Sequence, residues 1–251
     1  MPIISDEVDP DIRRSVKKGY KRAIVPIGSL EQHGSHLPVA TDAILAEEIA
    51  KRVSVLVDAF VLPCIYYGIS SEHKPLFNVS LRNETFTAMI GDICESLVEN
   101  GISRIVLLNA HYGNDAALAS TVQKIMDKAP KGTLIYSLSY WLVHDEIGHA
   151  DANETSLMLA IRPDLVNMKN ARGGSIKIGS LKSDKKLVLS KITMLPSSFP
   201  KLASNGVWGN PKNANSRKGR VMLDQISKRL ANVIKDVEKV HSTVFKGKNR
   251  V

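Results

Sequence analysis

Four candidate metal ligands fall within twelve residues near the start of the chain. They are Glu31, His33, His36 and Asp42, in the stretch PIGSLEQHGSHLPVATD at 26–42. Two imidazoles and two carboxylates form the mixed nitrogen and oxygen donor set that zinc, manganese and iron(II) accept. Water bound to such an ion loses a proton near neutral pH and becomes a hydrolytic nucleophile. The stretch therefore predicts half of a metal site, and the plainer alternative is a polar loop with a helix cap.

A second group of polar side chains follows two later apolar runs. His111 stands in NAHYGN at 109–114, and Trp141, His144 and His149 follow the next run. In open parallel α/β sheets, ligands bind beyond the carboxyl ends of the strands. We therefore expect these histidines to gather at one edge of a sheet.

Glu154 has a costly place for a carboxylate. A helical spacing puts it on the same face as Leu157, Met158 and Ile161. A carboxylate on an apolar face is unfavourable unless it is paired or bound to a metal. A salt bridge is the alternative for Glu154, and a helix N-terminal charge worth up to about 1 kcal/mol is the alternative for Asp42. Neither alternative explains why both carboxylates accompany histidines.

Other catalytic motifs are absent from the sequence. There is no GxSxG elbow, so Ser29 and Ser35 are interpreted as turn residues. HExxH, the Walker loop and GxGxxG do not occur either. Their absence argues against the zincin, P-loop and dinucleotide-binding classes.

Short β-rich apolar runs alternate with longer helical patterns, which is typical of a parallel sheet covered by helices. The expected strands are Ala23–Ile27, Phe60–Cys64, Arg104–Leu108 and Leu134–Ser137. The expected helices are Ala43–Val57, Glu84–Glu99, Asn114–Lys128, Asn153–Ile161 and, near the C-terminus, about 217–243. The pattern predicts a single α/β domain over 1–251, with an irregular basic insert at about 170–216.

The net charge of +9 is concentrated in the C-terminal third. Residues 1–168 carry 15 Lys/Arg and 21 Asp/Glu, a net charge of −6, whereas residues 169–251 carry 19 and 4, a net charge of +15. Such a surface could hold nucleic acid, a phosphorylated substrate or a neighbouring subunit, and a solvated lysine-rich surface is the plain alternative. No nucleic-acid-binding motif accompanies it, so nucleic acid is a minor hypothesis.

The compartment follows from three further features. No apolar run approaches the roughly 20 residues of a membrane span. The first residues are acidic, whereas a signal peptide begins with basic residues. Cys64 and Cys94 stand 30 residues apart in apolar contexts. We therefore expect a cytoplasmic protein with two buried thiols and no membrane contact.

Four blocks of the sequence resemble the creatininase family of metal-dependent amidohydrolases. They are PIGSLEQHGSHLPVATD at 26–42, LLNAHYGN at 107–114, HADANETSLMLAIRPDLV at 149–166 and GVWGNPKNANSRKG at 206–219. The resemblance implies a three-layer αβα sandwich with a mostly parallel central sheet, usually assembled as a homohexamer. It also implies two divalent ions, zinc, iron or manganese, that hydrolyse C–N bonds in small amides.

The resemblance assigns roles to individual residues. Glu31 and His111 match ligands of one metal. His33 matches a ligand of the other, and Asp42 matches the carboxylate that bridges them. His149 matches the proton-handling histidine, which protonates the leaving nitrogen after metal-bound hydroxide attacks the carbonyl.

One family ligand is missing. Creatininases carry a glutamate two residues after the third-strand histidine, and this position is Gly113 here. We predict that Glu154 supplies the missing carboxylate, because a half-empty second site would leave it as an uncompensated buried charge. His36 is assigned to the surroundings of the centre, where it orients a ligand or a loop. His73 and Tyr112 are candidates for the same surroundings or for substrate contact.

The predicted substrate pocket departs from that of creatininases. Trp141 matches their substrate-stacking tryptophan, but Asp145 stands at the place of their second tryptophan and Gly148 at the place of a glutamate. Deformylation of a formamidopyrimidine ribonucleotide in flavin and deazaflavin synthesis fits best, since a phosphate would suit the Lys/Arg-rich segment after residue 168. Creatinine hydrolysis and mycofactocin-type peptide cleavage are the alternatives within the family. A basic nucleic-acid-binding protein and a binding protein without catalysis are the alternatives outside it.

Overall fold

The computed structural model describes the chain except for residues 1–2, 144–147, 175–187, 189–191, 193–194 and 247–251. The described residues form a parallel four-stranded sheet in the order β2-β1-β3-β4. The strands are β1 (Arg22–Ile27), β2 (Phe60–Val61), β3 (Arg104–Asn109) and β4 (Leu134–Ser139). All four begin within one residue of the predicted start.

β2 is shorter than the sequence predicts. It ends at Val61 and not at Cys64, because Pro63 has no N–H to donate to the neighbouring strand. Pairing resumes beyond the proline, where Ile65 N–H donates to the carbonyl oxygen of Pro26 at 2.9 Å.

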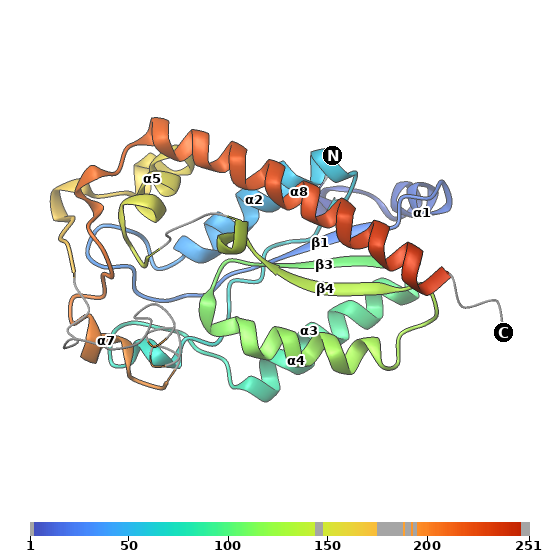
Figure 1. The fold of residues 1–251 in the computed structure, drawn as a ribbon, viewed down its shortest axis with the longest axis horizontal. Helices are drawn as coiled ribbons and strands as arrows, with labels where there is room; N and C mark the ends of the chain where they lie inside the picture. The colour runs from blue at the N-terminus through green and yellow to red at the C-terminus, as the bar shows by residue number, and fades with distance from the viewer. Residues whose placement is uncertain (1–2, 144–147, 175–187, 189–191, 193–194, 247–251) are drawn as a thin grey trace.

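Helices cover both faces of the sheet (Figure 1). α2 (Thr41–Val57), α5 (Ala152–Ile161) and α8 (Ser216–Lys246) lie on one face, and α3 (Asn83–Glu99) and α4 (Asp115–Met126) lie on the other. Alternate strand residues supply the two cores. In β3, Val106 and Leu108 pack with the first group of helices, and Ile105 and Leu107 pack with the second. The predicted three-layer αβα sandwich is confirmed.

The remaining described helices are short. α1 (Asp9–Lys17) is unexpected, because Ile12 and Val16 are its only apolar residues besides a proline; both are half-buried against the core that also contains Phe86. α7 (Phe199–Leu202) lies in the predicted irregular insert. Single 3₁₀ turns complete the described chain: η1 (Ile4–Asp6), η2 (Ser71–His73), η3 (Tyr112–Asn114), η4 (Tyr140–Val143), η5 (Pro163–Leu165), η6 (Met168–Asn170) and η7 (Pro211–Asn213).

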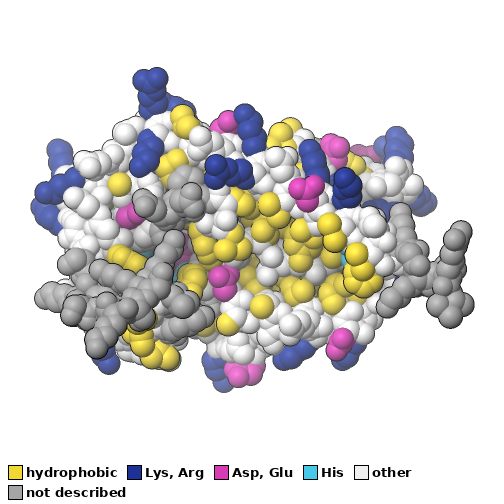
Figure 2. Space-filling view, in the orientation of Figure 1, with side chains coloured by type: hydrophobic (Ala, Val, Ile, Leu, Met, Phe, Trp, Pro, Cys, Tyr) yellow, Lys and Arg dark blue, Asp and Glu magenta, His cyan; other side chains and the backbone are white. Residues whose placement is uncertain are grey.

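The basic surface expected from the C-terminal third is present on α8, and one of the two expected buried thiols is buried. Figure 2 shows lysine and arginine side chains along α8, where Arg217, Lys228 and Lys235 are exposed. Beside this row, apolar side chains gather over the edge strand β4. Cys64 and Cys94 are free thiols; Cys94 is buried as predicted, whereas Cys64 is only partly buried. Among the described residues, no helix is both long and apolar enough to cross a bilayer.

Candidate metal centre

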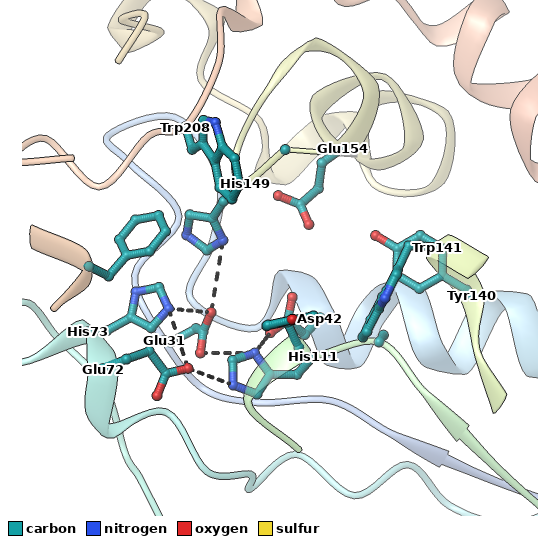
Figure 3. A pocket seen from close by; sticks show the side chains of 14 residues that line it. Glu31, Asp42, Glu72, His73, His111, Tyr140, Trp141, His149, Glu154 and Trp208 are labelled. Atoms are coloured by element: carbon teal, nitrogen blue, oxygen red, sulfur yellow. Dashed lines mark ion pairs between the residues drawn. The ribbon is translucent and has the colours of Figure 1, made fainter. Parts of the chain in front are cut away.

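The predicted site residues lie at the carboxyl ends of the parallel strands (Figure 3). β1 and β3 are neighbours in the sheet, but the chain continues from β1 to β2 on one side and from β3 to β4 on the other. Open α/β sheets form their ligand crevices at such a switch point. A cavity of about 200 Å³ lies there, and its acidic and histidine side chains are Glu31, Asp42, Glu72, Glu154, His73, His111 and His149.

Glu31, Asp42 and His111 converge on one point. Nδ1 of His111 lies 3.2 Å from Oε2 of Glu31 and 3.0 Å from Oδ2 of Asp42. Nε2 of the same ring lies 2.8 Å from the carbonyl oxygen of Ile69. In a neutral ring, Nε2–H therefore donates to Ile69, and the lone pair of Nδ1 faces the two carboxylates. Both carboxylate oxygens are buried without a hydrogen-bond partner among the described residues, which is costly unless a cation lies between them.

His33, Asp42 and Glu154 form a second cluster beside the first. Nδ1–H of His33 donates to the carbonyl oxygen of Glu31 at 3.0 Å, which leaves Nε2 free. Nε2 lies 3.1 Å from Oδ1 of Asp42 and 3.8 Å from Oε2 of Glu154. Glu154 is held in the first turn of α5, where its Oε2 accepts a hydrogen bond from Ala150 N–H at 2.5 Å. The two oxygens of Asp42 thus face two different imidazoles.

The spacing of these atoms suits bound cations. Donors around a tetrahedral ion, each about 2.0–2.1 Å from it, lie about 3.3 Å from one another. The donor separations in the two clusters are 3.2, 3.0, 3.1 and 3.8 Å. Carboxylates and imidazoles at this spacing suit zinc, manganese or iron(II). Asp42 is the carboxylate that the two clusters share.

The pKa shifts of the cavity residues indicate that the buried carboxylates need a nearby positive charge. Burial lowers the pKa of His33, but Asp42 and Glu154 outweigh burial and raise this pKa to about 10. Burial raises the pKa of Glu154 to about 8, against the opposing charge of His33. Burial also lowers the pKa of His111, yet Glu31 and the other nearby carboxylates raise it well above its usual value. No lysine or arginine lines the described part of the cavity, so protons on imidazoles neutralise the carboxylates unless a cation binds.

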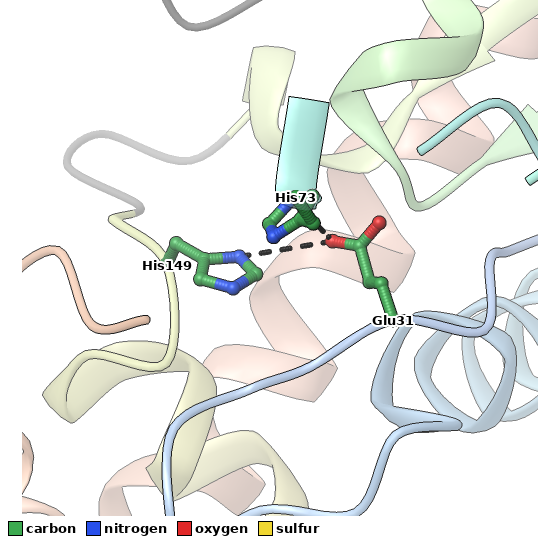
Figure 4. A group of neighbouring side chains, drawn as sticks. All are labelled: Glu31, His73 and His149. Atoms are coloured by element: carbon green, nitrogen blue, oxygen red, sulfur yellow. Dashed lines mark ion pairs between the residues drawn. The ribbon is translucent and has the colours of Figure 1, made fainter. Parts of the chain in front are cut away.

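His73 and His149 approach the other oxygen of Glu31 (Figure 4). Nε2 of His73 lies 3.1 Å and Nδ1 of His149 lies 4.0 Å from Oε1 of Glu31. Nε2–H of His149 donates to the carbonyl oxygen of Gln32 at 3.0 Å, so Nδ1 of the neutral ring presents its lone pair to the cavity. The side-chain amide nitrogen of Gln32 donates a hydrogen bond to Nδ1 of His73 at 2.9 Å. The same amide nitrogen lies 3.1 Å from Nε2 of His149. Burial and the charges of His33 and His73 hold the pKa of His149 well below its usual value.

The other residues predicted to surround the centre lie either outside the cavity lining or within it. His36 does not line the described cavity. Its Nε2 lies 3.0 Å from Oγ1 of Thr155 on α5, and burial lowers its pKa to about 4. This contact connects the loop that carries His33 to α5, the helix that carries Glu154. Tyr112 and Trp141 line the cavity, with ring centroids 6.0 Å apart.

Three further aromatic residues, Tyr140, Phe199 and Trp208, line the cavity and were missed by the sequence analysis. Trp208 lies beside His149 because their backbones pair, with N–H to oxygen distances of 3.1 and 2.8 Å. It supplies a second tryptophan to the pocket, and Asp145, which stands in the sequence at the place of the family's second tryptophan, lies outside the described residues. Phe199 stacks on His73 with ring centroids 4.6 Å apart. In the sequence, Trp208 stands in GVWGNPKNANSRKG at 206–219, one of the four blocks that resemble the creatininase family.

Glu72 is also missed, and it fills the space beside Gly113. A Cβ at Gly113 would overlap the carbonyl oxygen of Ile69 and lie 2.6 Å from Oε1 of Glu72. Oε1 of Glu72 lies 3.4 Å from Nε2 of His111. The close approach of the 69–73 segment therefore requires glycine at 113. The only sign of Glu72 in the sequence is its position next to His73.

A model of the creatininase family, described as creatinine amidohydrolase, matches residues 8–234. The chain belongs to the creatininase family. Creatinine amidohydrolase of Pseudomonas putida is 26% identical over 239 residues, 85% of this chain and 88% of the relative. A mycofactocin precursor peptide peptidase of Mycolicibacterium smegmatis is 34% identical over 148 residues, 56% and 58% of the two chains. The 2-amino-5-formylamino-6-ribosylaminopyrimidin-4(3H)-one 5'-monophosphate deformylase of Methanobrevibacter ruminantium is 26% identical over 151 residues, 57% and 59% of the two chains.

Solved creatininase structures share the fold, and two of them are described with metals. A creatininase described with manganese matches with a TM-score of 0.78 and 26% identity, over 93% of this chain and 97% of that one. A mutant creatininase of the Zn–Zn type matches with a TM-score of 0.79 and 25% identity, over 93% and 96%. This creatininase-family chain is an amidohydrolase that acts on C–N bonds other than peptide bonds.

Proposed function

We propose that this amidohydrolase holds two divalent cations and cleaves a C–N bond of a formamide or amide carried by a flat ring. One observation carries the proposal: the two oxygens of a single buried carboxylate, Asp42, lie 3.1 and 3.0 Å from nitrogens of two different imidazoles. Glu31 and His111 complete one half of the centre. His33 and Glu154 complete the other half.

Glu154, and not Glu72, is the proposed carboxylate of the second half. Oε2 of Glu154 lies on the side of His33 that has no backbone partner. Glu72 lies beside Nε2 of His111, and that nitrogen already faces the carbonyl oxygen of Ile69. A cation shared by Glu72 and His111 would have to displace this hydrogen bond.

The ions and the protein side chains would supply different parts of the proposed reaction. Two divalent ions at these residues would supply a nucleophile from water at neutral pH and polarise the substrate carbonyl. Nδ1 of His149 accepts a proton from the attacking water and passes it to the leaving nitrogen, so the amine departs neutral. The low pKa of His149 keeps this nitrogen free to accept the proton. His73 orients Glu31 by donating from Nε2 to its Oε1 at 3.1 Å.

The aromatic lining supports a flat substrate. Trp141 and Trp208 lie on different sides of the carboxylate cluster in Figure 3, and Tyr112 and Phe199 also line the cavity. Each stacked pair of rings contributes about 0.5–1.5 kcal/mol beyond its buried area. We propose a formylamino group on a pyrimidine ribonucleotide as the substrate, which the deformylase relative supports. The lysines and arginines after residue 168 would meet its phosphate, and much of that segment lies outside the described residues.

Creatinine is the second candidate substrate. It is also a flat ring with a cleavable C–N bond. The observation that favours it is the presence of two cavity tryptophans, Trp141 and Trp208. The creatinine amidohydrolase relative, which aligns with most of the chain, supports the same candidate.

The test measures formate and amine release by metal-reconstituted protein. The panel contains a formamidopyrimidine ribonucleotide, formanilide, creatinine and a mycofactocin-type peptide. We expect formate release that stops on chelation and returns when manganese or zinc is added. Asp164→Asn, which changes an exposed carboxylate, serves as the control and should match the wild type.

Four results would change the proposal. Hydrolysis of creatinine alone would move the assignment to the second candidate. Hydrolysis of the peptide alone would make the chain a peptidase. Turnover that survives chelation, or protein with two bound ions that hydrolyses nothing in the panel, would contradict the proposed function.

A further inference from the structure

Tyr140 carries a buried hydroxyl that faces the cavity. The residue begins η4 directly after β4, lines the cavity and is 1% exposed. In Figure 3 its oxygen points toward the space between Glu154 and Asp42. The hydroxyl opens onto the cavity, where a bound molecule can reach it.

The Tyr140 phenol is suited to be a donor. The ordinary pKa of a phenol, about 10, lies well above neutral pH, so the hydroxyl keeps its proton. Its ring is fixed by an edge-to-face contact with Trp141, with centroids 5.5 Å apart. The donor is therefore both protonated and held in one orientation.

An acceptor for this donor must come from the substrate. The carboxylates in the cavity are assigned to cations, and Nδ1 of His149 presents a lone pair. His149 and Tyr140 lie on opposite sides of the Asp42 carboxylate in Figure 3. The nitrogen and the oxygen of an amide also point in different directions from the carbonyl carbon. With the leaving nitrogen toward His149, the carbonyl oxygen lies toward Tyr140.

We propose that the Tyr140 hydroxyl donates a hydrogen bond to the carbonyl oxygen of the scissile amide and stabilises the negative charge that develops there. As water adds to the carbon, the C=O electron pair moves to the oxygen. It returns when the C–N bond breaks and the nitrogen takes the proton that His149 received from the water. The phenol keeps its own proton throughout. The reaction rests on the proposed function, whereas contact between the hydroxyl and a tetrahedral oxyanion can be tested without turnover.

Tyr140→Phe tests the inference, with Tyr136→Phe as the matched control. Tyr136 lies on β4, and its hydroxyl is buried without a partner among the described residues, but it is outside the cavity lining. Both variants should bind as many ions as the wild type and unfold at the same or a higher temperature. Removing one oxyanion donor lowers kcat by about 10²–10³. We expect this loss for Tyr140→Phe with KM nearly unchanged, and no loss for Tyr136→Phe.

Calorimetry supplies a readout that does not need turnover. Methylphosphonate imitates the tetrahedral adduct, and acetamide imitates the planar substrate. Tyr140→Phe should weaken the binding of methylphosphonate markedly and leave the binding of acetamide nearly unchanged. Wild-type kcat together with wild-type methylphosphonate affinity would overturn the inference. A loss confined to KM would overturn it too, because Tyr140 would then be only a wall of the pocket. If the wild type hydrolyses no amide, the proposed function fails, and the methylphosphonate comparison alone decides the role of Tyr140.

Discussion

Glu154 should destabilise the metal-free protein and stabilise the metal-bound one. Burial raises its pKa from 4.5 to about 8. Between these pH values the folded chain keeps a proton that the unfolded chain releases, so the free energy of unfolding falls by about 1.4 kcal/mol per pH unit. The loss begins above pH 4.5, reaches about 3 kcal/mol at pH 7 and is complete above about pH 8.

The substitution that isolates this charge is Glu154→Gln, which keeps the shape of the side chain. In the presence of a chelator, the variant should be more stable than the wild type by up to about 3 kcal/mol at pH 7, and nearly equal to it at pH 5. Metal should reverse the order, because the variant lacks a ligand. Loss of a residue that only supports a ligand weakens metal binding about 10–100-fold. Loss of the ligand itself should exceed 100-fold, equivalent to about 2.7 kcal/mol of stabilisation.

Urea unfolding at pH 5, 7 and 8.5, with chelator or with zinc, measures both effects, and mass spectrometry counts the bound ions. Glu72→Gln is the control, since it removes a carboxylate of the same cavity that lies outside the proposed centre. A metal-free Glu154→Gln protein no more stable than the wild type at pH 7 would refute the charge argument. Loss of the second ion from Glu72→Gln, with retention by Glu154→Gln, would refute the ligand assignment.

Three further substitutions test other parts of the site. Gly113→Ala should destabilise the protein by about 1–3 kcal/mol in thermal unfolding, because its Cβ overlaps the carbonyl oxygen of Ile69; wild-type stability would show that the 69–73 segment moves freely. Trp208→Ala should raise KM for flat substrates in steady-state assays with two ions still bound, and an unchanged KM would remove Trp208 from the pocket wall. His149→Asn should lower kcat about 10²–10⁴-fold, less for amides with electron-poor amines, since these leave without a proton; an equal loss for all amides would contradict the role of His149.

The layered fold could be predicted from the sequence because its core elements have strong apolar patterns. β3 and α3 are buried against neighbouring elements and begin at or next to the predicted residue. α1 is hard to predict, because only Ile12 and Val16 of its residues pack against the core. β2 was overextended because the prediction followed the apolar run past Pro63, although a proline without an N–H signals that strand pairing is interrupted.

The candidate site could be predicted where its residues directly follow strands or begin helices. Glu31, Asp42 and His111 stand at such places, and the structure brings both carboxylates within 3.2 Å of Nδ1 of His111. Glu72 and Trp208 lie on irregular segments. They reach the cavity through the close approach at Gly113 and through backbone pairing with His149. Such tertiary contacts leave no periodic pattern in the sequence.

The count of bound ions in the wild type and in Asp42→Asn, measured together with formate release, tests the central claim most directly. The shared position of Asp42 predicts two ions per wild-type chain. It predicts loss of both ions and of turnover in Asp42→Asn, with the helical circular dichroism retained. An Asp42→Asn protein that keeps two ions and full turnover would contradict the proposed bridging centre, as would an active wild type without metal.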